Sequence, residues 1–323
     1  MGRLSVVELA GGGGPDLARD ALSGLSSRPK SLPPAHFYDA EGSRLFEVIT
    51  RAPEYYLTRT EHGILHRHAG EIVAGLGGPA TLVELGSGSS TKTRALIEAL
   101  LMRQDGLHYV AIDVSRAALL DAAPGLLRDY PGLRVTACVG GYACGLAWLR
   151  KSRPGRILAL CLGSSIGNLD DEQARLLLEG AAELDCRWVL GADLRKDRAV
   201  LEAAYNDAAG VTARFNLNLL RRLNAELGGR FDPSAFRHRA FYDERAGRIE
   251  MHLESSRAQD VPVAALERTF HFERGERIHT EDSRKYTLDQ LDALAAGAGL
   301  RLAGRWLDER RWFSVASFER ASS

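Results

Sequence analysis

Cysteine, long apolar runs and an excess of one charge are all scarce in this sequence. The four cysteines form no C-x-x-C pair, so their spacing indicates neither a disulfide framework nor a zinc site. The 42 basic and 42 acidic residues balance to a formal net charge of +0, which leaves no strong field for nucleic acid or an anionic membrane. No apolar run approaches the length of a membrane span or the core of a signal peptide. We therefore expect a cytoplasmic protein that binds neither nucleic acid nor a membrane.

A glycine is also missing from the stretch Thr81 to Arg94, TLVELGSGSSTKTR. Its apolar start predicts a buried strand, Gly86 and Gly88 predict a tight turn, and a helical pattern begins at Thr93. A dinucleotide fingerprint and a P-loop both require glycine where Thr91 stands. The pattern that remains, E-x-G-x-G, is typical of S-adenosylmethionine (SAM) sites. A lone match also occurs where a glycine turn merely joins a strand to a helix.

A second apolar run, His108 to Val114, ends in the acidic residue Asp113. An acid at the end of the second strand is placed to accept hydrogen bonds from two ribose hydroxyls. This position favours a ribose-bearing cofactor, although Asp113 is also a plausible turn residue beside a helix cap at Ser115. Further patterns predict strands at 134–139, 156–162 and 188–192 and a helix at 171–184. The alternation predicts a doubly wound, Rossmann-like α/β sheet that binds ligands at the carboxyl ends of its strands.

Beyond Lys196 the regular alternation of strands and helices stops. The expected elements are helices over 199–227 with a break near Gly210, a loop at 231–241, strands at 248–255 and 267–272, and then helix 288–297 and strands 301–306 and 312–319. The first 30 or so residues suggest a loosely packed start. We expect a SAM-binding domain interrupted by an α+β substrate domain. Its parts are residues 1–60, an N-terminal segment of the substrate domain; 61–196, the first part of the methyltransferase domain; 197–286, the substrate domain; and 287–323, the return to the methyltransferase domain.

Several long stretches carry a more specific signal than the glycine turn. They are LPPAHFYDAEGSRLFE, APEYYLTRTE, VELGSGSSTKTR, LGSSIGNL, AAYNDAAGVTARFNLNLL, FRHRAFYD, RIEMHL and IHTEDSRKYT, and they span about residues 31 to 318. Together they resemble the L-histidine Nα-methyltransferases of ergothioneine biosynthesis. The resemblance implies an enzyme that uses SAM to methylate the α-amino group of L-histidine successively to hercynine, the first step of that pathway. It implies no metal.

The resemblance also implies roles for individual residues. Its SAM-contacting positions correspond to Gly86, Gly88, Lys92, Asp113, Gly141 and Tyr142. Its substrate positions correspond to Tyr56, Gly163, Asn168, Tyr205, Met251, Glu281 and Ser283, and Tyr38 resembles the catalytic tyrosine close to the amine. Among these, Asn168 and Tyr205 resemble the pair that holds the carboxylate. Glu281 and Ser283 resemble the residues that grip the imidazole ring, with Met251 packing nearby.

One position departs from the family pattern. After the third strand the family has an aspartate followed by phenylalanine, whereas this chain has Gly141 and Tyr142. The aspartate of the family accepts a hydrogen bond from the adenine amino group, so we expect weaker or rearranged adenine binding here.

Two other interpretations remain open at the level of sequence. The first keeps methyl transfer but changes the substrate to another aromatic amino acid or amine, because fold does not fix substrate. The second is a non-catalytic SAM- or partner-binding protein. Retention of the whole set of substrate-side residues argues against both. We expect a monomer whose partner is the small molecule histidine.

Overall fold

The chain folds into two compact units. The computed structural model describes residues 2–9, 16–184 and 186–321, so the Gly11–Gly14 run lies outside the described residues. The large-sheet unit contains the described residues of 1–14, 57–195 and 285–323, and the small-sheet unit contains those of 15–56 and 196–284. Within the described residues from 16 onward, the chain passes between the units after Tyr56, Arg195 and Arg284.

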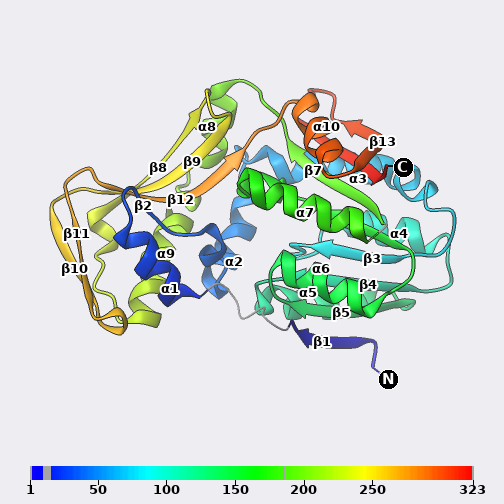
Figure 1. The fold of residues 1–323 in the computed structure, drawn as a ribbon, viewed down its shortest axis with the longest axis horizontal. Coiled ribbons are helices and arrows are strands. Elements are labelled where there is room, and N and C mark those ends of the chain that lie inside the picture. Colours follow the sequence, from blue (N-terminus) through cyan, green and yellow to red (C-terminus); the bar gives the residue numbers. More distant parts are fainter. Residues whose placement is uncertain (1, 10–15, 185, 322–323) are drawn as a thin grey trace. The chain divides into compact units, whose positions relative to one another are not determined.

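The large-sheet unit is built on an eight-stranded sheet with the order β1-β5-β4-β3-β6-β7-β14-β13 (Figure 1). Its strands are β1 (Leu4–Glu8), β3 (Thr81–Leu85), β4 (Leu107–Asp113), β5 (Leu133–Val139), β6 (Ile157–Cys161), β7 (Arg187–Asp193), β13 (Leu300–Leu307) and β14 (Phe313–Arg320). Its helices are α3 (Tyr56–Ala74), α4 (Arg94–Leu101), α5 (Arg116–Asp129), α6 (Tyr142–Ser152), η2 (Ser165–Asn168), α7 (Asp171–Glu183) and α10 (Leu288–Gly297). Strands β1 to β7 of this sheet pair in parallel, and β14 and β13 close it in antiparallel fashion. The predicted doubly wound α/β fold is confirmed.

Apolar side chains cover both faces of the central strands. On one face, Val83, Val110 and Ala159 belong to a core cluster that continues into α6, α7 and α10, and α6 and α7 lie side by side over the sheet in Figure 1. Fully buried strands of a parallel sheet are covered on both faces by their crossover helices. From β3 the chain proceeds to β4 and β5 on one side and later to β6 and β7 on the other. The carboxyl ends of β3 and β6 therefore mark the switch point where sheets of this kind bind ligands.

The small-sheet unit is built on a four-stranded sheet with the order β2-β12-β9-β8. Its strands are β2 (Lys30–Ser31), β8 (Phe236–Asp243), β9 (Arg248–Ser255) and β12 (Arg277–Arg284), and β10 (Gln259–Val263) and β11 (Arg268–Phe272) form a separate antiparallel pair. Its helices are α1 (Leu17–Ser26), η1 (Pro34–Phe37), α2 (Ala40–Ile49), α8 (Arg198–Tyr205), α9 (Val211–Leu227), η3 (Pro233–Ala235) and η4 (Ala264–Leu266). Helix α9 packs against α2 and against β8 and β9, and it buries Phe215 and Leu219 there. The expected break near Gly210 separates α8 from α9 and is confirmed.

Three sequence-based expectations were wrong in this fold. The start of the chain is not loosely packed throughout, because β1 pairs with β5 along its whole length and α1 buries Ala21 and Leu25. Strand β1 consequently belongs to the sheet of the large-sheet unit rather than to the substrate domain. The predicted loop at 231–241 contains most of β8, which pairs with all eight residues of β9. Its arginines alternate with residues that face the helices, so their charge is compatible with a strand.

Helix ends agree with the local sequence. Asp170 caps α7 and Thr287 caps α10, each in a reciprocal capping box with the glutamine three residues later. Such boxes satisfy amide groups that a helix leaves unpaired at its start. Among the described residues, the helices lack the combination of length and apolar character that crossing a bilayer requires.

Candidate functional site

The predicted cofactor residues lie in the turns that follow the parallel strands of the large-sheet unit. The turns after β3, β5 and β6 each contain glycines with positive φ: Gly86 (74°), Gly88 (49°), Gly140 (155°) and Gly163 (76°). Residues other than glycine rarely adopt a positive φ. Because parallel strands end at the same edge of a sheet, these turns and Asp113 at the end of β4 are neighbours. The predicted residues of this unit are therefore brought together at one edge.

Direct contacts join the first glycine turn to Asp113. The Gly88 N–H donates to Asp113 Oδ2 at 2.9 Å, and the Ser115 N–H donates to Oδ1 at 2.8 Å. Burial raises the pKa of Asp113, and the backbone donors act in the opposite direction. Each carboxylate oxygen has two lone pairs, and the residue is half-buried. Asp113 therefore keeps acceptor sites for hydroxyl groups while its orientation is fixed by the turn it faces.

The acidic residue of the E-x-G-x-G pattern, Glu84, has a structural position. It is buried and accepts hydrogen bonds from the hydroxyls of Thr93, at 2.6 Å, and Tyr109. Ser90 lies 2.9 Å from the same tyrosine hydroxyl. Thr93 stands at the start of α4 and makes no side-chain cap there, because its hydroxyl is used by Glu84. This cluster ties β3 and β4 to the start of α4.

The position where the chain departs from its family, Gly141, is sterically open. It has φ −79° and ψ 171° as the N-cap of α6 and provides no side-chain cap. A Cβ built on it meets no atom within 4 Å. The next residue, Tyr142, reaches back to the first turn, because a Cβ on Gly86 would lie 2.9 Å from its hydroxyl. Burial raises the pKa of that hydroxyl, so it is a neutral phenol.

A residue that the sequence analysis missed, Glu61 of α3, connects two predicted ones. Its carboxylate is fully buried, forms an ion pair with Lys92, and accepts the Gly163 N–H at 2.8 Å. A Cβ on Gly191 of β7 would lie 1.8 Å from Glu61 Oε1. Only glycine therefore fits beside this carboxylate. The signal was present in the sequence as an acid three positions before Ile64, on the buried face of a helix.

The predicted residues of the small-sheet unit also form a connected group. The hydroxyls of Tyr205 and Ser283 lie 2.7 Å apart in a buried position. The centroids of the Tyr205 and Tyr55 rings are 6.3 Å apart. Tyr55 in turn packs edge-on against Phe46, with 6.2 Å between the ring centroids. The Tyr38 ring contacts Phe46 at 5.7 Å. A continuous aromatic wall therefore joins the predicted catalytic tyrosine to the predicted substrate residues.

Met251 and Glu281 are directly opposite each other on β9 and β12. Both are buried, and Ser283 follows two residues later on the same face of β12. An irregularity between His279 and Glu281 shifts the register of the pair. A bulge of this kind re-aims side chains. It places Thr280 and Glu281 on the buried side in succession.

Tyr56 has a neighbour that the sequence analysis also missed. Lys196 donates to the Tyr56 hydroxyl at 2.7 Å, and its ammonium lies 4.3 Å from the centre of that ring. No pattern in the sequence links these two residues, which are far apart along the chain. A lysine beside a predicted substrate residue adds positive charge to this part of the small-sheet unit.

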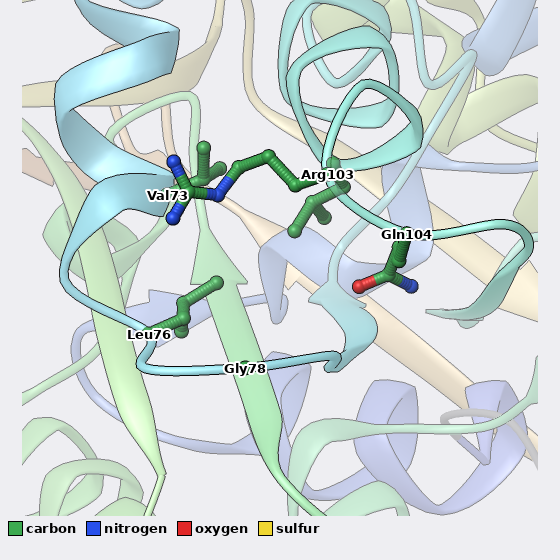
Figure 2. Close-up of a pocket in the computed structure, with 6 residues that line it drawn as sticks. Val73, Leu76, Gly78, Arg103 and Gln104 are labelled. Atoms are coloured by element: carbon green, nitrogen blue, oxygen red, sulfur yellow. The ribbon is translucent and has the colours of Figure 1, made fainter.

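A cavity of about 310 Å³ in the large-sheet unit lies away from the glycine turns. Figure 2 shows Val73 from α3 and Leu76, which follows that helix, on one side of it, and Arg103 and Gln104, which follow α4, on the other. The Gln104 amide is occupied by backbone groups of Ala80 and Gly106. This cavity contains none of the predicted residues and lies beside the amino end of β3. We assign it no part in the candidate site.

Comparison with known proteins identifies relatives over nearly the whole chain. Residues 17–320 match the family model described as "Histidine-specific methyltransferase, SAM-dependent". A histidine N-alpha-methyltransferase of Mycolicibacterium smegmatis is 43% identical over 303 residues, which cover 93% of this chain and 94% of the relative. Ergothioneine biosynthesis protein 1 of Neurospora crassa is 33% identical over 86% of this chain and 32% of its own length. The N-methyltransferase benX of Aspergillus terreus is 32% identical over 92% of this chain and 86% of its own.

The buried cluster at Glu84 predicts a pH dependence of stability. Burial raises the pKa of Glu84 from 4.5 to about 7, so between these values the folded chain keeps a proton that the unfolded chain has released. Stability is therefore lost as pH rises through this window. Glu84→Gln does not titrate, and between pH 5 and pH 8 the wild type should lose roughly 2 kcal/mol more unfolding free energy than the variant.

The measurement is urea unfolding of both proteins at the two pH values. Hydrogen exchange of the β3 and β4 amides reports the unfolding of this unit specifically. An equal change in both proteins would show that Glu84 does not bind a proton in this pH range.

Proposed function

Because the chain belongs to the family of SAM-dependent histidine-specific methyltransferases, we propose that it transfers three methyl groups to the α-amino nitrogen of L-histidine. The product is the betaine hercynine, and the reaction is the first step of ergothioneine biosynthesis. The observation that carries the proposal is the buried polar group of the small-sheet unit, formed by Tyr205, Glu281 and Ser283 among aromatic neighbours.

The turns of the large-sheet unit fit the proposed binding of SAM. Gly86 and Gly88 leave bare backbone at the switch point, and Asp113 offers a carboxylate to ribose hydroxyls. We propose that Tyr142 and Gly141 border the adenine. Lys92 is neutralised by Glu61, so we propose that it positions the turn residues around it and adds no net positive charge beside a cationic ligand. When bound, SAM supplies the activated methyl group on a sulfonium.

The small-sheet unit supplies groups that suit histidine. We propose that Glu281 accepts a hydrogen bond from a ring N–H of the imidazole, which an apolar aromatic amino acid lacks. We propose that the Ser283 hydroxyl also contacts the imidazole ring and that Met251 packs beside the ring. The phenol of Tyr205 is a neutral donor for the substrate carboxylate, and we assign the same role to the Asn168 amide of the large-sheet unit. Tyr56 with Lys196 and the half-buried turn at Gly163 are further substrate-side candidates.

The amine must lose its proton before each methylation, and a nearby cation lowers an amine pKa by repulsion. No strong general base is then required of the protein. The remaining task is to hold the amine in line with the methyl group. We propose that the Tyr38 hydroxyl forms a hydrogen bond with the amine, and that the aromatic wall around it stabilises positive charge as methyl groups accumulate.

A different amine is the second candidate function. The specific observation in its favour is that benX, a relative named only as an N-methyltransferase, matches almost as much of the chain. Gly141 also departs from the family pattern. The large-sheet unit alone does not discriminate between the two substrates, because it would bind SAM in either case.

The cysteines bear on where the reaction takes place. No disulfide joins any of the four within the described residues, which suits the reducing cytoplasm. We therefore propose a cytoplasmic enzyme. We also propose that it acts as a monomer.

Mass spectrometry of the products tests the proposal. Histidine, tryptophan and tyrosine are incubated separately with the protein and SAM, and a series of mono-, di- and trimethylated products is expected from histidine alone. Methylation of tryptophan or tyrosine would support the second candidate. The absence of any methylated product would contradict both.

Removing the hydroxyl of Tyr38 tests its proposed place beside the amine. Tyr38→Phe should slow methyl transfer by about tenfold, the worth of one hydrogen bond, while leaving the affinity for SAM nearly unchanged. The rate is measured at saturating substrate and SAM affinity by calorimetry. Tyr130→Phe is the matched control, since it removes a hydroxyl bonded to Glu98 on the surface of the other unit. A wild-type rate in Tyr38→Phe would remove this tyrosine from the mechanism.

Restoring the acid of the family pattern tests the role of position 141. Gly141→Asp should fit without strain, because the backbone there is extended and a Cβ meets no atom within 4 Å. If the position borders the adenine, the new acceptor should tighten SAM binding by roughly tenfold. Gly141→Ala fits equally well but supplies no acceptor, so its affinity should stay at the wild-type level. Calorimetric titration with SAM distinguishes the two variants, and equal affinities would place the adenine elsewhere.

A further inference from the structure

The small-sheet unit carries a second group of polar side chains, on the face of β9 and β12 opposite to the predicted substrate residues. Along β9, Ile249, Met251 and Leu253 are buried, whereas Glu250 and His252 alternate with them and are partly exposed. His252 is opposite His279 on β12, and Glu250 is opposite Asp282. Two histidines and two carboxylates consequently share one patch of the sheet, which we call the His252–His279 face.

The side chains of this face converge. The ligand atoms of Glu250, His252 and His279 all lie within 4.8 Å of one another. His252 Nε2 is 3.0 Å from Glu250 Oε2, and His279 Nε2 is 2.9 Å from Asp282 Oδ1. Nearest ligand atoms of a tetrahedral zinc site are separated by roughly 3.3 Å, given metal–ligand distances near 2 Å. Small rotations of these partly exposed side chains would bring their ligand atoms to the separation that a zinc site requires.

One of the rings is already held in position. The Phe241 ring stacks on His252 at 5.4 Å with an interplanar angle of 3°. His252 Nδ1 is buried without a hydrogen-bond partner among the described residues. Nε2 is therefore the nitrogen of this ring that faces polar groups, which leaves one mode of coordination. Preorganisation of this kind reduces the free energy needed to assemble a site.

We propose that the His252–His279 face binds one divalent first-row transition-metal ion through His252 Nε2, His279 Nε2 and the Glu250 carboxylate, with Asp282 as the fourth ligand. Mixed imidazole and carboxylate donors suit zinc and its neighbours in the first row, whereas magnesium and calcium take sets of oxygen ligands. The bound ion links β9 to β12. The inference is independent of the proposed methyl transfer.

The main competitor for this site is Arg248. Its guanidinium contacts Glu250 at 2.7 Å and Asp282 at 3.2 Å, so it partly neutralises the carboxylates that would bind the ion. Four more arginines lie on this face of the sheet by their register: Arg237, Arg239, Arg277 and Arg284. Arg239 and Arg277 both pair with Glu254. Metal binding therefore has to displace one arginine, which lowers the affinity of the wild-type chain.

Calorimetric titration with zinc chloride tests the proposal on the full-length chain, purified without a histidine tag and freed of metal with a chelator. One saturable site is expected. His252→Gln and His279→Gln should each weaken it by about tenfold or more. Arg248→Gln should strengthen binding by about tenfold, because it removes the competing cation. Visible absorption of the cobalt complex provides a second readout, since nitrogen and oxygen ligands around cobalt change its spectrum.

His271→Gln is the matched control. This exposed histidine lies between Asp260, which contacts its Nδ1, and Glu273, which contacts its Nε2. Its two carboxylates face different ring nitrogens, so the three groups do not surround one ion, and the variant should bind zinc as the wild type does. Absence of saturable binding overturns the proposal, and so does binding that His252→Gln and His279→Gln leave unchanged. Circular dichroism checks the fold of each variant, and His279→Gln with Arg248→Gln decides the question if His252→Gln does not fold.

Discussion

The arrangement of the predicted residues at the carboxyl edge of the large sheet depends on one buried carboxylate, that of Glu61. Burying a charge is costly unless it is paired and hydrogen-bonded, and here the ammonium of Lys92 and the N–H of Gly163 meet both requirements. Gly191 has no side chain, which leaves space for the Glu61 carboxylate. The start of α4, the turn after β6 and the middle of β7 are thereby attached to α3 through a single group. Loss of that group would leave the half-buried Lys92 without its counterion and the Gly163 N–H without its acceptor at the same edge.

The two faces of the small sheet carry different kinds of side chains. Side chains alternate between the faces of a strand, so Met251 and Glu281 point to the buried side while Glu250 and His252 occupy the other. The register shift before Glu281 keeps this separation although β12 carries polar residues almost throughout. A change on one face therefore acts on the other through the backbone of β9 and β12, without side-chain contact.

How much of this could be predicted from the sequence differs between the two units. The parallel strands β3 to β7 were predictable because each is a short apolar run followed by glycine or ended by an acid, and the turn at Gly86 was recognisable for the same reason. The parallel strand β1 was not predicted. Strand β8 was not, because its arginines and aromatics resemble a loop until its pairing with β9 is known. The contact of Lys196 with Tyr56 and the convergence of His252 with His279 arise from tertiary structure. No spacing along the chain encodes them.

In the proposed function, substrate choice comes from the small-sheet unit, which contains Glu281 and Ser283. Relatives with different names match this chain over similar lengths, so a shared sheet and its glycine turns carry no information about the amine. In the proposed site the buried carboxylate of Glu281 carries that information, because a hydrogen bond to a charged group contributes more free energy than an apolar contact. Under the proposed role of Glu281, a substrate without a ring N–H forfeits one hydrogen bond to that carboxylate. Discrimination then arises from the difference between the contacts that the right amine makes and those that the wrong one makes.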